Sequence, residues 1–247
     1  MIRPTTIPQE LRDLQIEQAV AREALRLAFE HHRSLAREMV GVARQRDVGE
    51  LFEQQAGGQT LVSLHNLDLI IGSGGVLSHA PERWQAALML LDAFAPEGKT
   101  TLAVDSIFMM PQLGVISTLH PRAATEVFDR DCLVRLGDVI APVGAARDGD
   151  PCLSVRVNNG PPLHVPFGAL RVLPLGVGET VTIEVRPASK HFDLGAGRNK
   201  PATFTVEGGV VGLILDTRGR PLALPSDERA RAAKLREWMA ALATPVE

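Results

Sequence analysis

Aromatic side chains are scarce in this chain of 247 residues, which has 8 Phe, 2 Trp and no Tyr. Proteins that stack nucleic-acid bases on aromatic platforms carry more of them. The formal net charge is −3, and no long basic tract is present to track a phosphate backbone. Nucleic acid is therefore not an expected partner of this protein.

Cysteine and long apolar runs are also lacking. Cys132 and Cys152 are the two cysteines, too few for a disulfide framework or a cysteine-based metal cluster. No apolar run approaches the roughly 20 residues that a membrane-spanning helix needs. The opening residues MIRPTTIPQEL lack the apolar segment of a signal peptide. We therefore expect no membrane association and a location in the reducing cytoplasm.

Periodicity divides the chain into two regions near residue 130. Residues 1–130 combine helical patterns with short apolar strands at 67–71 and 100–104, which indicates an α/β arrangement. Residues 131–247 hold about six short β-rich runs separated by turn signals, followed by a helix that Ser226 would cap. The expected fold is α+β: an α/β portion, then a β-rich barrel or sandwich, and then a terminal helix.

The first predicted helix is apolar on two faces. One face carries Leu11, Leu14, Ala21, Leu25 and Ala28, and the other carries Ile16, Val20 and Leu27. A helix that is apolar on two sides needs a covering partner on each. The second face would pair either with a part of a longer protein or with another copy of this chain, giving a homodimer.

The most informative motif is a glycine turn, Gly72-Ser73-Gly74-Gly75, directly after the strand at 67–71. Glycine has no Cβ, so a ligand can approach the backbone closely, and the start of a following helix favours polar or anionic groups. The alternative is a tight strand-to-helix turn that needs a positive φ. The spacing is not the dinucleotide-binding fingerprint, because no third glycine follows at the required offset.

Two neighbouring residues are accessory candidates. His79 would either cap the next helix or touch a ligand, and Asp105 follows the second strand, where capping the next helix is favoured over catalysis. The loop Asp193-Leu194-Gly195-Ala196-Gly197 contains Asp-x-Gly but follows a polar run rather than a buried strand, so we expect an ordinary loop there. No residue pattern predicts a catalytic centre or a metal site.

Several long strings resemble one family. The stretch LDLIIGSGGVLSHAPERWQAALMLLDAFAPEGKTTLAVDSIFMMPQLGVIS closely resembles the GlmL family, also called MutL, which is unrelated to the mismatch-repair protein of that name. The opening residues, PLHVPFGALRVLPLGVGE, HFDLGAG and EGGVVGLILDTRGRPL resemble it as well, so the resemblance covers nearly the whole chain. Genes of this family lie beside those of cobalamin-dependent mutases, such as glutamate mutase and aminomutases.

This resemblance implies an ATP-binding protein of the actin–hexokinase superfamily that protects or reactivates its mutase. Family members are much longer, and the chain resembles only their C-terminal portion. Their first half supplies an Asp-x-Gly phosphate loop and the magnesium site, so we expect no complete ATPase site here. By position in the motif, Gly72, Ser73, Gly74 and Gly75 would form the adenosine loop for ATP or ADP.

Two other functions stay open. Hydantoinase-type and oxoprolinase-type relatives in the superfamily use ATP to drive chemistry on cyclic amides or ketones, but no general base or metal cluster is recognisable in this sequence. A protein-interaction module that binds no nucleotide is the third interpretation. Nucleotide titration separates it from the first.

Overall fold

The computed structural model describes residues 7–36 and 61–243. The helices are α1 (Leu11–Leu35), α2 (Gly75–Ser78), α3 (Arg83–Phe94), α4 (Met110–Ser117), α5 (Pro121–Val127) and α6 (Glu228–Leu242). The strands are β1 (Leu69–Gly72), β2 (Gly98–Asp105), β3 (Leu133–Ala141), β4 (Pro151–Val157), β5 (Leu163–Pro166), β6 (Leu170–Leu173), β7 (Thr180–Pro187), β8 (Ala202–Glu207) and β9 (Leu213–Asp216). None of the described helices combines the length and the apolar character needed to cross a bilayer.

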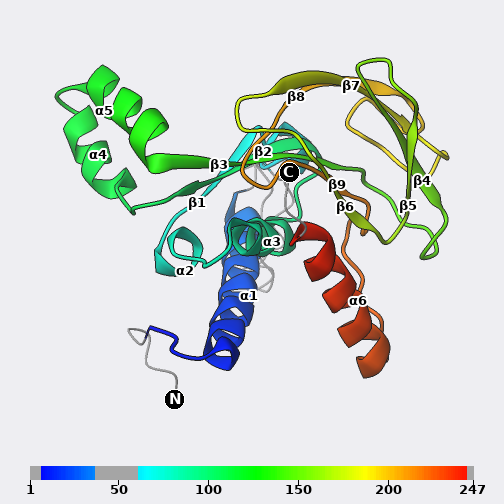
Figure 1. Ribbon diagram of the computed structural model, residues 1–247, viewed down its shortest axis with the longest axis horizontal. Coiled ribbons are helices and arrows are strands. Elements are labelled where there is room, and N and C mark those ends of the chain that lie inside the picture. Colours follow the sequence, from blue (N-terminus) through cyan, green and yellow to red (C-terminus); the bar gives the residue numbers. More distant parts are fainter. Residues whose placement is uncertain (1–6, 37–60, 244–247) are drawn as a thin grey trace, which may run out of the picture.

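The described strands form two sheets (Figure 1). A five-stranded mixed sheet has the order β1-β2-β3-β9-β6, in which β1 and β2 are parallel and β3 pairs antiparallel with β2. A four-stranded antiparallel sheet has the order β5-β4-β7-β8. The chain is thus a mixed α/β protein with two separate sheets.

Of the expected barrel or sandwich, the barrel is wrong for the described residues. Strands β3, β6 and β9 join the first sheet, and only β4, β5, β7 and β8 form a sheet of their own. Strand β3 pairs with β2 along Gly98 to Asp105. This edge of β3 is therefore already occupied and cannot pair with a strand of a separate barrel. The boundary expected near residue 130 falls between these two paired strands, and the division into two domains stays a prediction.

The five-stranded sheet lies between a layer of helices and the second sheet (Figure 1). Successive side chains of a strand point to opposite faces, and β3 shows this alternation clearly. Val139 and Ala141 belong to the core shared with α3 and α6, whereas Ile140 belongs to the core shared with β4 and β7. Strand β9 alternates in the same way, and its Ile214 belongs to the core shared with the helices. The central strands are therefore buried on both faces.

Helix α1 shows which of its two apolar faces is covered. Ala21 and Leu25 pack against the core beside α3, as the first face predicts. Leu11 and Ala28, expected on that face, are exposed, Leu11 at the first residue of the helix and Ala28 in its last third. The second face, with Ile16, Val20 and Leu27, is exposed.

Side-chain caps define the starts of α3 and α6. Gln85 accepts a hydrogen bond from the backbone N–H of Glu82 at 3.2 Å, which completes half of a capping box. At α6 the cap is Asp227 rather than the expected Ser226, because the Asp227 carboxylate accepts the N–H of Ala230 at 2.7 Å. Leu242 of α6 is buried in the helical layer, and Leu235 and Met239 of the same helix pack against that core.

A helical segment projects from the layered body. Residues 106–132, called the arm here, contain α4 and α5 and extend to one side of the five-stranded sheet (Figure 1). Pro111 and Pro121 each occupy the first turn of their helix, where a missing N–H costs nothing. A small core of Leu113, Ala124 and Cys132 holds the arm together.

Candidate functional site

The glycine turn lies at the carboxyl edge of two parallel strands. Residues 69–72 of β1 pair in parallel with residues 101–104 of β2, so Gly72 and Val104 end side by side. Ligands of open α/β sheets bind outside the carboxyl ends of parallel strands. The turn Gly72–Gly75 and the carboxylate of Asp105 therefore share one edge of the sheet.

The three glycines of the turn have different structural roles. A Cβ at Gly72 would lie 3.0 Å from Leu77 and 3.2 Å from Leu90, so these leucine side chains would have to shift by a few tenths of an ångström. Gly74 has φ +101°, a conformation that other residues rarely adopt. At Gly74 and Gly75 no heavy atom of the described residues lies within 4 Å of such a Cβ. The turn thus needs glycine for its backbone geometry at Gly74 and presents an open backbone surface at Gly74 and Gly75.

Asp105 joins the glycine turn to the arm. Its buried carboxylate accepts hydrogen bonds from the backbone N–H groups of Met109, at 3.1 Å, and Met110, at 2.8 Å. The Ser73 hydroxyl donates to the same carboxylate at 3.3 Å, and the Ser78 hydroxyl donates to the Asp105 backbone carbonyl. Asp105 is not the N-cap residue of α4, which is Met109, but its carboxylate accepts N–H groups at the start of this helix and ties α4 to the turn.

His79 stands apart from these contacts. It is exposed and follows the last residue of α2, where its backbone N–H donates to the carbonyl of Gly75 at 2.9 Å. Helix α3 begins only at Arg83, so His79 does not cap it. A ligand contact by His79 stays a prediction.

The Asp193 loop is closed on itself, as expected for an ordinary loop. The Asp193 carboxylate accepts the backbone N–H of Gly195 at 2.8 Å and that of Gly197 at 3.0 Å. The Asp193 backbone also pairs with Val143. The N–H groups of Gly195 and Gly197 both donate to the same carboxylate oxygen, Oδ1, and hold the side chain within its own loop.

Neither thiols nor metal ligands form a second site in the described part of the chain. No group of three His, Cys, Asp or Glu side chains is placed there to hold a metal ion. Cys132 and Cys152 are buried free thiols. Burial, reinforced by the Asp216 carboxylate, raises the pKa of Cys152 to about 12, so this thiol stays protonated at neutral pH.

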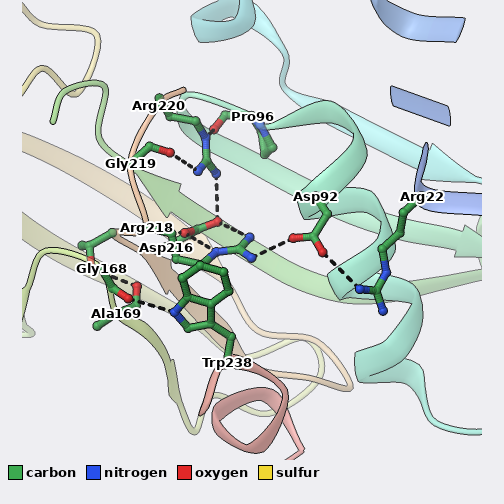
Figure 2. A network of polar contacts seen from close by, with 11 residues as sticks. Arg22, Asp92, Pro96, Gly168, Ala169, Asp216, Arg218, Gly219, Arg220 and Trp238 are labelled. Atoms are coloured by element: carbon green, nitrogen blue, oxygen red, sulfur yellow. Dashed lines mark hydrogen bonds and ion pairs between the residues drawn. The ribbon is translucent and has the colours of Figure 1, made fainter. Parts of the chain in front are cut away.

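A buried network of charged side chains was not anticipated by the sequence analysis (Figure 2). Asp216 ends β9, and Arg218 and Arg220 follow it in the same loop. Asp92 comes from α3 and Arg22 from α1, so the five side chains bring together three elements distant in sequence. Asp216, Arg218 and Arg220 are all at least 95% buried.

Direct contacts link every member of the network. Asp216 accepts hydrogen bonds from Arg218 Nε at 2.9 Å and Nη2 at 2.8 Å, and from Arg220 Nη2 at 2.8 Å. Arg218 Nη1 reaches Asp92 at 2.7 Å, and Arg22 Nη1 reaches the other oxygen of Asp92 at 3.4 Å. Both oxygens of each carboxylate are thereby in use, which leaves neither free for chemistry.

Helix α6 completes the network. The Trp238 ring lies against the Arg218 guanidinium, with 5.0 Å between the ring centroid and Cζ. Trp238 Nε1 donates to the carbonyl of Gly168 at 2.8 Å, and Arg220 Nε donates to the carbonyl of Pro96 at 2.9 Å. The network therefore joins α1, α3, β9 and α6, and its contacts indicate a structural role.

Electrostatics keeps the network ionised. Burial by itself would raise the pKa of Asp216, but the guanidinium groups of Arg218 and Arg220 outweigh it and hold this pKa well below its usual range. Burial would likewise lower the pKa of Arg218, and Asp216 and Asp92 raise it instead. The one available signal in the sequence was the spacing Asp-x-Arg-x-Arg immediately after the apolar run 210–215.

Comparison with known proteins identifies one family. Comparison with the curated proteins and with the solved structures gives no significant match. A family model described as MutL protein matches residues 1–132, which include α1, β1, the glycine turn, β2 and the arm. Because this match covers more than half of the 247 residues, the chain belongs to the MutL family, the glutamate mutase-associated family that its sequence resembles.

Proposed function

We propose that this chain carries the adenosine-binding part of a nucleotide site and acts in a nucleotide-responsive, chaperone-like factor for a cobalamin-dependent mutase. One observation carries the nucleotide proposal. Gly74 and Gly75 leave an open backbone surface at the carboxyl edge of β1 and β2, where parallel sheets bind ligands. A flat adenine or ribose face can approach such a surface because no Cβ stands in its way.

In the actin–hexokinase arrangement that the resemblance implies, the phosphate groups would bind to another half of the family's proteins. The Asp193 carboxylate is held within its own loop and is not a substitute for that half. We therefore assign binding of ADP or ATP to this chain's turn, and hydrolysis to the assembled site.

A bound nucleotide would act on the arm through Asp105. Ser73, within the turn, donates to the carboxylate that caps α4, so a shift of the turn changes the support of that helix. A ligand shifts a conformational equilibrium only by its differential affinity for the two states. In this proposal the nucleotide-bound and nucleotide-free arrangements of turn and arm are those states, and the mutase binds one of them more tightly.

Calorimetric titration with ADP and with ATP plus magnesium tests the nucleotide proposal. The decisive variant is Gly75→Val, because Gly75 has open space and no positive φ, so the added methyl groups obstruct the surface without straining the backbone. Gly74→Val would confound obstruction with strain. The control is Gly176→Val, an exposed glycine without a positive φ.

Binding by the wild type and by Gly176→Val but not by Gly75→Val supports the adenosine loop. Equal binding by all three proteins contradicts it. Absence of binding by the wild type favours the interaction module that takes no nucleotide. For the mutase, the informative assay starts from enzyme whose cobalamin cofactor has been inactivated. The recovery of its activity is measured with each nucleotide, in the presence of either the wild-type protein or Gly75→Val.

A further inference from the structure

The arm exposes an unusual amount of apolar surface. Five large side chains in it are between 45% and 78% exposed: Ile107, Phe108, Val115, Ile116 and Leu119. Together they present on the order of 500 Å² of apolar area, within the range in which the largest patch of a monomer is often functional. The contacts of the arm's own small core, around Leu113, leave these side chains outside.

This surface is also free of charge. From Ser106 to Leu119 the chain contains no Asp, Glu, Lys, Arg or His, although 22% of the whole chain is charged. Around a two-fold axis a patch meets its own copy, so any charge at its centre would face a like charge. An uncharged patch avoids this repulsion and leaves no buried ion without a partner.

Gly114 adds a second indication. It lies in the interior of α4, where glycine destabilises a helix relative to alanine. It is exposed, and no heavy atom of the described residues lies within 4 Å of a Cβ built on it. Leu113 points inward while Gly114 and Val115 are exposed, so glycine stands where another helix can approach the backbone closely.

We propose that the arm is a self-association surface, on which α4 of a second copy of this chain packs across α4 near Gly114 and Val115. Figure 1 shows the arm projecting from the layered body, which lets two arms meet without a collision of the bodies. Two such patches bury at most about 1,000 Å² in total, at the lower limit for a specific interface. The dimer is therefore reversible, with dissociation in the micromolar range.

Sedimentation velocity across a concentration series tests this proposal. We expect wild-type protein to shift from monomer to dimer, and Val115→Glu to weaken the dimer at least tenfold because it places two like charges at the axis. Val177→Glu is the matched control, an equally exposed valine between β6 and β7. Leu27→Glu tests the competing surface on α1. Val177→Glu and Leu27→Glu should both dimerise like the wild type.

Thermal unfolding of each variant establishes that it is folded, which the exposure of Val115 leads us to expect. Gly114→Ala should raise the melting temperature and weaken the dimer, since the methyl group favours the helix and obstructs the close approach. A wild type that stays monomeric at several hundred micromolar overturns the proposal. So does dimerisation that survives Val115→Glu or is lost in Leu27→Glu.

Discussion

Replacement of Arg218 by methionine should destabilise this protein far more than replacement of a surface arginine. The substitution removes two hydrogen bonds to Asp216 and one to Asp92, together with the contact to the Trp238 ring. Breaking a buried ion pair costs about 3–5 kcal/mol, because the remaining charge loses its partner in a medium of low polarity.

The structure places Arg218→Met at the lower end of that range. Asp216 keeps the guanidinium of Arg220 at 2.8 Å, and Asp92 keeps Arg22 at 3.4 Å, so neither carboxylate is left alone. We expect a loss of about 3 kcal/mol. Asp216→Leu leaves two buried arginines facing each other, so a loss of about 5 kcal/mol is expected for it.

Urea unfolding followed by circular dichroism measures both values, provided that the slope m stays unchanged. For a chain of this size, 3 kcal/mol corresponds to a melting temperature lower by about 6–12 °C. The control Arg122→Met breaks an exposed pair with Glu126 and should leave the unfolding curve unchanged. The double variant Asp216→Leu/Arg218→Met should lose less than the sum of the two single variants. A loss below about 1 kcal/mol in Arg218→Met would refute the reasoning, since the network would then contribute little to stability.

Three further outcomes follow from the described contacts. The pKa of Asp216 is lower in the folded than in the unfolded protein. Its contribution to the free energy of unfolding is therefore complete above the unfolded pKa of about 4 and declines as the pH falls below that value. Measuring the stability of wild type and Asp216→Asn as a function of acid pH tests this. Gly137→Ala should cost about 2–4 kcal/mol in urea unfolding, because its Cβ would lie 1.9 Å from the Gly212 carbonyl at φ +136°, whereas Gly176→Ala should change little. Cys152 should react with a thiol reagent at pH 8 only after urea unfolding, and rapid labelling of the native protein would contradict its burial and raised pKa.

Local patterns in the sequence were sufficient to locate most elements of the fold. The apolar runs at 67–71 and 100–104 predicted β1 and β2, and the apolar spacing from Leu11 to Ala28 predicted α1. The glycine turn was also predicted, as was the association of Asp105 with the start of the next helix. Each of these depends on residues within about one helical turn or one strand, where propensity and periodicity act directly.

Pairing between distant segments was decided only by the tertiary structure. Periodicity shows that β3 and β9 are buried but not which strands they join. The β-rich region expected as a barrel or sandwich therefore divides between two sheets, with β3, β6 and β9 in the five-stranded sheet and β4, β5, β7 and β8 in the other. Asp216 lies two residues from Arg218, but the other carboxylate partner of Arg218, Asp92, is 126 residues away, and no local rule connects them. Burial of a charge depends on a counter-charge brought to it by the fold. The sequence by itself determined where helices, strands and the glycine turn lie, and the tertiary structure decided which charges meet and which apolar faces stay open, because those contacts join residues far apart along the chain.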